Sequence, residues 1–256
     1  MSVILRTVLT MLMLSRAPAF ASTEQISQEP SNKKQTQNQV TPKLFKHSLS
    51  GLYGIESFKQ DIHQPYSEFE SLYLTAVSAQ QELETICMSS ALISGTQTQF
   101  AGVKSRQRAE EKIAADLDGN VSKITDLARA TIIAEDVEGL VSAFESISNQ
   151  TKIVGVKNRF KSPAPSGYRD LNILVELPET KIVAEVQLHL AGIEKVKSGP
   201  EHDLYEIIQG IERKAQSENR AMTEWEESKI ASLRNESKAL YQQAWQPYIT
   251  THLKAA

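Results

Sequence analysis

Residues 181–190 alternate between apolar and polar side chains, and this pattern limits the fold more than any other feature of the chain. The polar positions are Glu185, Gln187 and His189, and even-numbered positions from Ile182 to Leu190 are apolar. A period of two places the two sets on opposite faces of a β-strand. The segment therefore predicts a half-buried strand whose polar face carries a carboxylate, an amide and an imidazole.

Other segments predict the elements around this strand. Further strands are expected at 100–103, 130–134, 152–161 and 171–177. Helical spacing runs through 44–93 and 137–147, Ser105 can cap a charged helix over 105–117, and residues from 203 onward read as helix. This order predicts an α+β fold in which a mixed five-stranded sheet is flanked by helices. We expect Trp225 and Trp245 to lie in the core.

Composition excludes several classes of protein. The chain has 256 residues, of which 40% are hydrophobic, and this is typical of an ordinary globular protein. Its net charge of −3 argues against a nucleic-acid partner. Cys87 is the single cysteine, so no internal disulfide can form, and a buried position on a helix suits it.

The N-terminal region leaves the location of the protein open. Residues 1–21 are either a weak signal peptide or a disordered N-terminus, and 22–43 are typical of a disordered spacer. A single domain is expected over 44–256. No stable membrane association is expected, because the apolar run is too short to span a bilayer. We expect a cytoplasmic protein, with export as the alternative.

Charged residues gather at the ends of the expected strands. Asp126 precedes one strand, Glu185 lies on another, and lysines and arginines flank several. Two carboxylates with phosphate oxygens and water form a usual magnesium shell. Tyr168, between a glycine and two charged residues, is the expected exposed aromatic for stacking on a purine. Singly, Asp126 could cap a turn and Glu185 could pair with Lys181, but the ordered series predicts a magnesium–nucleotide site.

Within about 95–215, this series resembles the synthetase domain of the RelA/SpoT family, closest to its RelV-like small alarmone synthetases. The resemblance is carried by the following motifs: Val103-Lys104-Ser105 with Lys112, Asp126-Leu127-Ala128-Arg129, Arg159-Phe160-Lys161 before Gly167-Tyr168, Glu185-Val186-Gln187, and Glu201-His202-Asp203-Leu204-Tyr205. These enzymes transfer pyrophosphate from ATP to the 3′-hydroxyl of GDP or GTP and use Mg²⁺. ATP and GDP or GTP are therefore the expected partners, and a homo-oligomer stays open.

The resemblance also implies roles for individual residues. Asp126 and Glu185 correspond to the metal-binding carboxylates, and Glu185, Asp126 and Arg129 to catalytic residues. The expected ATP-binding residues are Lys104, Ser105, Lys112 and Arg129. The expected GTP-binding residues are Tyr168, Arg159, Lys161, Asn172, Gln187 and His202, with His189 in support.

Three departures from the family pattern put the acceptor nucleotide in doubt. Gly102 replaces a common arginine, the loop between Lys161 and Gly167 lacks a usual lysine, and Asn172 replaces a common histidine. The alternatives are a toxin-like relative that modifies adenosine nucleotides or tRNA, and an inactive nucleotide binder. The segment before the match has His47 and His63 but no His-Asp pair. We therefore expect synthesis without hydrolysis.

Overall fold

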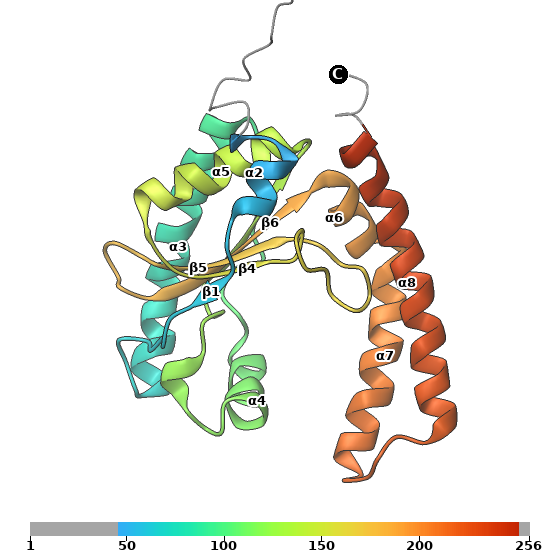
Figure 1. Ribbon diagram of the computed structural model, residues 1–256. Helices are drawn as coiled ribbons and strands as arrows, with labels where there is room; N and C mark the ends of the chain where they lie inside the picture. Colours follow the sequence, from blue (N-terminus) through green and yellow to red (C-terminus); the bar gives the residue numbers. More distant parts are fainter. Residues whose placement is uncertain (1–45, 251–256) are drawn as a thin grey trace, which may run out of the picture. The chain divides into compact units, whose positions relative to one another are not determined.

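The structure is a computed structural model that describes residues 46–250. The predicted N-terminal segments at 1–21 and 22–43 lie outside these residues, and the predicted domain boundaries stay predictions. The described chain has an α+β fold with a mixed six-stranded sheet flanked by helices (Figure 1). The predicted fold class is confirmed, with one strand more than expected.

The sheet brings together polar positions from three strands. Its order is β1 (Phe58–Lys59), β4 (Lys152–Asn158), β5 (Leu171–Glu176), β6 (Val183–Leu190), β3 (Arg129–Ala134) and β2 (Gln97–Gln99). Among these strands, β3 and β6 run parallel and the other neighbours are antiparallel. The register places Arg129 beside Glu185 and Asn172 beside Gln187. Paired residues point to the same face, so these four side chains share one surface.

The opposite, apolar face of the sheet is covered by helices. α3 (Phe69–Ser94) and α5 (Val137–Gln150) pack on it and on each other, and α2 (Leu49–Gly54) packs on α5 (Figure 1). The Asp136 side chain caps α5 by accepting a hydrogen bond from the backbone N–H of Gly139 at 2.8 Å. Cys87 is buried on α3, as expected, and burial raises the pKa of its thiol to about 12.

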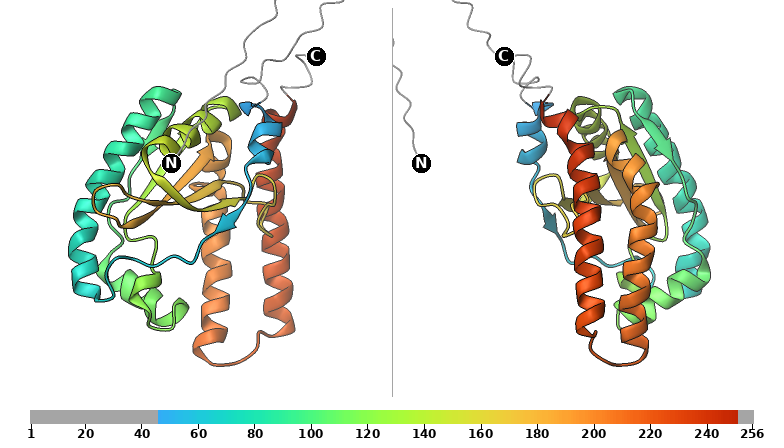
Figure 2. Two further views of the ribbon diagram at one scale, coloured as in Figure 1. Left: turned by 60° about the vertical axis from the view of Figure 1, so that its left-hand side comes forward. Right: turned by 90° about the vertical axis from the view of Figure 1, so that its right-hand side faces the viewer.

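The remaining helices lie around the polar face. α4 (Arg106–Asp116) follows β2, after the loop that contains Lys104, and the short helix η1 (Val121–Lys123) follows α4. α6 (Ala191–Lys197) leaves the end of β6 directly. α7 (Pro200–Ser217) and α8 (Glu224–Thr250) run side by side as a helical hairpin (Figure 2).

A capping box starts α8. The Thr223 hydroxyl accepts a hydrogen bond from the backbone N–H of Glu226 at 3.3 Å, and the Glu226 carboxylate accepts one from the backbone N–H of Thr223 at 2.8 Å. Within residues 46–250, no helix combines the length and apolar character needed to cross a bilayer.

Three local predictions are wrong. Residues 100–103 form no strand, because Gly102 has a left-handed φ of 68° and β2 already ends at Gln99. β1 was not expected, since its two exposed residues are extended only through pairing with β4. Trp245 is buried, but Trp225 is 71% exposed at the start of α8 and is not part of the core.

Candidate active site

Asp126 lies between η1 and β3 and is held by two lysines. Its Oδ2 accepts hydrogen bonds from Lys104 Nζ at 2.9 Å and Lys112 Nζ at 2.8 Å. The backbone N–H of Lys104 donates to the carbonyl oxygen of Leu127 at 2.9 Å, which fixes the loop before α4 beside Asp126. Lys112 reaches the same carboxylate from α4. The sequence-predicted residues Asp126, Lys104 and Lys112 therefore form one cluster.

The second oxygen of Asp126 has a different environment. Oδ1 is buried and has no hydrogen-bond partner within residues 46–250. Burial by itself would raise the pKa of the Asp126 carboxyl, but the hydrogen bonds from Lys112 and Lys104 outweigh it and lower the pKa below its usual value. The carboxylate is therefore ionised at neutral pH and keeps one oxygen without a protein donor.

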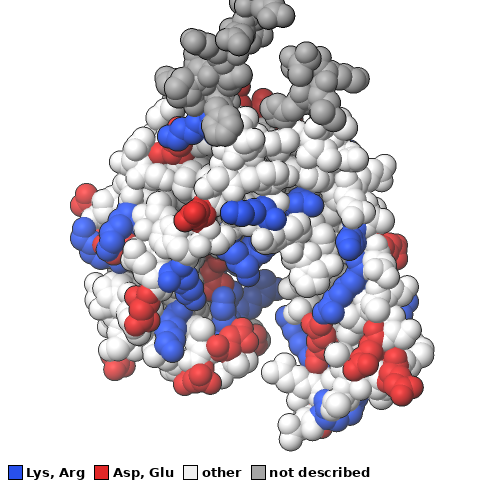
Figure 3. All heavy atoms as spheres, viewed as in Figure 1, with Lys and Arg blue, Asp and Glu red and all other residues white. Residues whose placement is uncertain are grey.

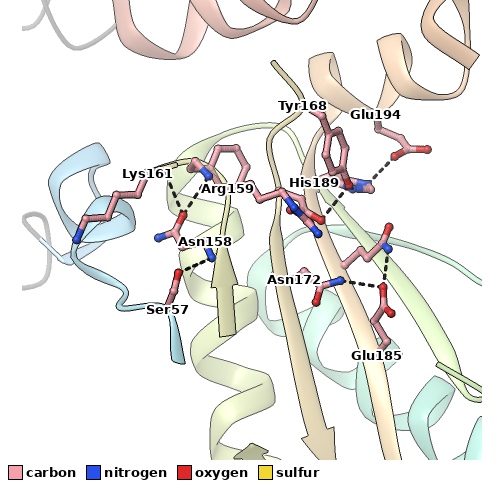
Figure 4. A network of polar contacts seen from close by, with 12 residues as sticks. Ser57, Asn158, Arg159, Lys161, Tyr168, Asn172, Glu185, His189 and Glu194 are labelled. Carbon is pink, nitrogen blue, oxygen red and sulfur yellow. Dashed lines mark hydrogen bonds and ion pairs between the residues drawn. The ribbon is translucent and has the colours of Figure 1, made fainter. Parts of the chain in front are cut away.

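Glu185 extends from β6 on the polar face of the sheet. Its Oε1 accepts hydrogen bonds from Asn172 Nδ2 at 2.8 Å and Gln187 Nε2 at 2.6 Å. Figure 4 shows Asn172 reaching Glu185 from the neighbouring strand β5. In the described chain no hydrogen bond involves the other oxygen, Oε2. The alternative of a surface pair with Lys181 is not formed, because the Lys181 Nζ donates to the carbonyl oxygen of Pro178 at 2.6 Å instead.

Arg129 lies beside Glu185 at the start of β3. Gln80 of α3 fixes its backbone through two hydrogen bonds, of 2.9 Å to its N–H and 3.0 Å to its carbonyl oxygen. The Nε atom of Arg129 is buried and has no hydrogen-bond partner among the described residues. A buried guanidinium nitrogen in this state is ready to donate to an anionic ligand.

A cleft of about 1150 Å³ opens between α4 and α7 beside Asp126. We call it the donor cleft. Figure 3 shows this hollow with Lys and Arg side chains around it. Lys104 and Lys112 line one wall together with Arg108, and α7 supplies the other wall with His202, Tyr205, Gln209 and Arg213. The lining also contains four acidic side chains, Glu111, Asp116, Glu206 and Glu212, and its basic side chains can bind the phosphates of a ligand.

Sequence reasoning missed three residues of the donor cleft. Arg108, Tyr205 and Arg213 lie on α4 and α7, from which the sequence motifs indicated only Lys112 and His202 as binding residues. Tyr205 is 51% exposed, although a large aromatic side chain on an amphipathic helix is usually buried. The sequence does not reveal the role of this exposed ring, because Tyr205 lines a cleft only where α7 lies opposite α4.

A second group of residues surrounds Tyr168, and we call it the acceptor corner. The Tyr168 hydroxyl donates to Asp170 Oδ2 at 2.9 Å and lies 2.6 Å from His189 Nε2 (Figure 4). Arg159 Nη1 donates to Asp170 Oδ1 at 2.5 Å, and its guanidinium lies 5.5 Å from the centre of the Tyr168 ring. Burial, and then the Asp170 carboxylate, raise the pKa of the Tyr168 hydroxyl above its usual value.

The expectation that Tyr168 is an exposed aromatic is wrong. The ring is only partly accessible, since Tyr241 of α8 packs edge-on against it at 5.6 Å and His189 does so at 5.8 Å. Gly167 has a left-handed φ of 84°, and a Cβ there would lie 3.1 Å from the backbone of Lys238 in α8. The local sequence predicted a surface loop, but α8 packs against that loop and covers part of the ring.

The structure separates two expected nucleotide-binding residues from their predicted groups, and a third, Ser105, has the capping role that the sequence predicted. Lys161 is exposed, and its side chain extends away from Tyr168 in Figure 4. His202, expected with the acceptor nucleotide, lines the donor cleft instead. Ser105 caps α4 by accepting a hydrogen bond from the backbone N–H of Arg108 at 3.4 Å.

The two carboxylates fit a magnesium ion by their chemistry. Asp126 keeps the buried, unpartnered Oδ1, and Glu185 keeps Oε2 free of hydrogen bonds within the described chain. Residues 46–250 contain no group of three or more His, Cys, Asp or Glu side chains able to hold a metal alone. A pair of carboxylate oxygens completed by phosphate oxygens and water is the usual arrangement for Mg²⁺.

Comparisons with known proteins give the class of the fold. No protein-family model matches the chain. Among curated proteins, it is similar to the (p)ppApp synthetase toxin Tas1 of Pseudomonas aeruginosa (strain UCBPP-PA14), with 30% identity over 142 residues that cover 56% of this chain. The match spans 31% of the length of Tas1, so less than a third of that protein is represented.

Two solved structures have the same fold. One is the complex of the Type VI effector Tas1 with its immunity protein, at 23% identity and a TM-score of 0.53, covering 70% of this chain and 96% of that chain. The other is small alarmone synthetase 2 from Bacillus subtilis, at 20% identity and a TM-score of 0.53, covering 71% and 95%. The chain therefore has the fold of the small alarmone synthetases of the RelA/SpoT family. This confirms the predicted resemblance at the level of the fold.

Proposed function

We propose that the protein transfers a pyrophosphoryl group from ATP to the ribose 3′-hydroxyl of a purine nucleotide. One observation carries this proposal: Asp126 lies between two lysines at the donor cleft and keeps a buried oxygen without a partner. A carboxylate that only stabilised the fold would have both oxygens satisfied. Cations around a free carboxylate oxygen suit a triphosphate that brings its own metal ion.

ATP would bind in the donor cleft. Lys104, Lys112 and Arg129 are placed to neutralise its phosphates, and Arg108 and Arg213 line the same space. Tyr205 is the exposed aromatic of this cleft, and it can stack on the adenine base. We therefore assign Tyr205 to the donor nucleotide and move His202 to this side of the site.

The reaction needs positioning and charge neutralisation more than covalent catalysis. The acceptor 3′-oxygen attacks the β-phosphorus of ATP, the bond between the α,β-bridging oxygen and that phosphorus breaks, and AMP leaves. Glu185 is placed to take the proton of the 3′-hydroxyl, because Asn172 and Gln187 orient its carboxylate through Oε1 and leave Oε2 free. Asp126 Oδ1 would hold Mg²⁺, which supplies positive charge to the phosphates when bound, and Glu185 Oε2 would be its second ligand only if another group takes the proton.

The motif that contains Tyr168 favours a guanosine nucleotide, GDP or GTP, as the acceptor. A purine base would stack on the accessible part of its ring, and Arg159 lies close enough to meet acceptor phosphates. The product would then be (p)ppGpp. Synthesis would take place in the cytoplasm, where both substrates occur.

An adenosine acceptor is the second candidate, and one feature of the acceptor corner favours it. Guanine has N–H groups that can donate hydrogen bonds to a free carboxylate. The buried carboxylates around Tyr168 are already paired: Asp170 with Arg159 and Tyr168, and Glu194 with His189. The curated relative is itself named a (p)ppApp synthetase. If the acceptor is an adenosine nucleotide, we expect the protein to be an exported toxin that has an immunity partner.

A product assay tests these proposals. The full chain is incubated with Mg²⁺, labelled ATP and each of GDP, GTP, AMP and ADP, and the products are separated by chromatography. A 3′-pyrophosphorylated product that disappears in Glu185→Gln and Asp126→Asn, but persists in Glu176→Gln, supports the transfer reaction. Glu176 serves as the control, because it lies at the end of β5 and its carboxylate is paired with Lys152. The acceptor that is consumed decides between guanosine and adenosine, and no product with any acceptor contradicts the enzyme assignment.

A further inference from the structure

His189 is the buried centre of a chain of polar contacts that ends at Tyr168. Its side chain has 0% exposure, its Nε2 lies 2.6 Å from the Tyr168 hydroxyl, and its Nδ1 lies 2.5 Å from Glu194 Oε2. Glu194 comes from α6, so the chain links the sheet, the loop before β5 and the helix after β6. The proposed chemistry at Asp126 and Glu185 does not use this group.

The contacts favour one arrangement of hydrogens around Tyr168. Asp170 pairs with Arg159 at 2.5 Å, and a carboxylate in an ion pair accepts hydrogen bonds. The single phenolic hydrogen therefore points to Asp170. The Tyr168 oxygen then accepts from His189, which places a hydrogen on Nε2. On the other side of the ring, Nδ1 lies 2.5 Å from Glu194 Oε2, although this contact does not have the geometry of a hydrogen bond.

Charged groups lie on every side of His189. Glu194 Oε2 lies beside Nδ1, and Lys197 lies 3.5 Å from the same oxygen. On the other side of the chain, Asp170 is balanced by Arg159. Tyr241 faces the Tyr168 ring and donates its own hydroxyl hydrogen to Glu201 at 3.0 Å, so it does not compete for Asp170. Two carboxylates and two basic side chains thus surround the imidazole ring and its contact with Tyr168.

We propose that His189 and Glu194 are positioning residues of the acceptor site, which fix the ring of Tyr168 so that the acceptor base can stack on it. The hydroxyl is held by His189 and Asp170, and Tyr241 packs against the ring edge-on. A ring held at these points cannot rotate about its χ angles, so the stacking surface exists before the nucleotide arrives. This inference rests on the proposed function, because that function makes Tyr168 the stacking residue.

Equilibrium binding tests the positioning role without requiring turnover. GDP and ADP are titrated as acceptors, and the non-hydrolysable ATP analogue AMPCPP as the donor, each by calorimetry on the full chain. We expect His189→Leu to weaken binding of the preferred acceptor by about tenfold and to leave AMPCPP binding within about twofold, since only the acceptor contacts Tyr168. His189→Gln, which keeps a donor near the position of Nε2, should restore part of the loss.

The control is a second His–Glu pair away from the site. His47 Nε2 contacts Glu145 Oε2 at 3.0 Å, and His47→Gln should leave both nucleotides unaffected. Equal losses of acceptor and donor binding in His189→Leu, together with a lowered melting temperature, would overturn the positioning role in favour of a purely structural one.

A double-mutant cycle and a spectrum complete the test. Tyr168→Phe removes the hydroxyl, so His189→Leu should add no further loss in that background, whereas additive losses contradict the link between the two residues. ¹⁵N NMR of the wild type should show a hydrogen on Nε2 of His189, as donation to the Tyr168 oxygen requires, and an unprotonated Nε2 contradicts the hydrogen assignment. If the wild type binds GDP or ADP in this pattern but forms no product, the transfer reaction fails and the positioning role stands.

Discussion

The donor cleft is open and two of its basic side chains make no ion pair with a described residue, whereas the acceptor corner is buried and its polar groups are paired with one another. Within residues 46–250, no hydrogen bond engages the guanidinium groups of Arg108 or Arg213 in the cleft. At the acceptor corner, Arg159 and His189 each contact a carboxylate. Under the proposed function, the phosphates of the ligand would complete the donor side, while contacts within the protein already organise the acceptor side.

The largest expected effect lies where the two regions meet. Glu185→Gln should lower kcat by about 10²- to 10⁴-fold, because it removes the proton acceptor but keeps a side chain of the same size. The KM values for both nucleotides should change little. Initial rates with saturating substrates measure this effect, and Glu176→Gln serves as the control. A loss below about tenfold would mean that another group takes the proton.

Removal of a donor-side cation should have the next largest effect. Lys112→Met should lower kcat/KM for ATP by about 100-fold, because a half-buried charge pairs more strongly with phosphate than a fully exposed one. The hydrogen bond from Lys112 lowers the pKa of Asp126, so its loss should raise that pKa and move the acid limb of the pH–rate profile to higher pH. Lys152→Met removes an exposed lysine that pairs with Glu176 and should leave both properties unchanged.

A third prediction concerns the open wall of the cleft. Tyr205→Ala should raise the KM for ATP by about tenfold and leave the acceptor KM unchanged, because stacking of a base on an aromatic ring is worth about 1–3 kcal/mol. Tyr205→Phe should behave like the wild type. The matched control is Trp225→Ala, which removes an exposed aromatic that does not line the cleft. An equal rise in both KM values would contradict the division into two regions.

The smallest effect is expected at the turn between α7 and α8. This helical hairpin joins the donor cleft, which α7 lines, to the acceptor corner, where α8 packs. Hydrogen bonds from Arg220 and from the Thr223 backbone lower the pKa of Glu226 from 4.5 to about 2. A lowered carboxyl pKa contributes stability above the unfolded-state value, and this contribution is lost as the pH falls through the folded-state value. Glu226→Gln should therefore reduce hydrogen-exchange protection at the start of α8 at pH 7.

The pH dependence of the Glu226→Gln effect checks this explanation. The difference from the wild type should shrink as the pH falls from 4.5 toward 2. Glu227, one position along α8, has no ion pair with a described residue. Glu227→Gln should therefore match the wild type in hydrogen-exchange protection at both high and low pH. A difference for Glu226→Gln that does not depend on pH would mean that packing, and not charge, secures the hairpin.

The sequence by itself determined the local elements and the main chemical groups. Alternation predicted β6, apolar spacing predicted α5, and Ser105 marked the start of α4, because these signals depend on neighbouring residues alone. Asp126 and Glu185 could be selected as metal-binding candidates from their residue type and their order along the chain. The fold class followed from the sequence of elements, and the structural neighbours confirm it.

The tertiary structure alone decided which residues share a site. β1 exists only through pairing with β4, and Tyr205 and His202 form a cleft wall only because α7 lies opposite α4. The partial burial of Tyr168 likewise depends on α8, far along the chain. Local patterns reflect the preferences of a few consecutive residues, whereas these contacts join segments separated by long stretches of chain, and only packing of the whole domain brings them together.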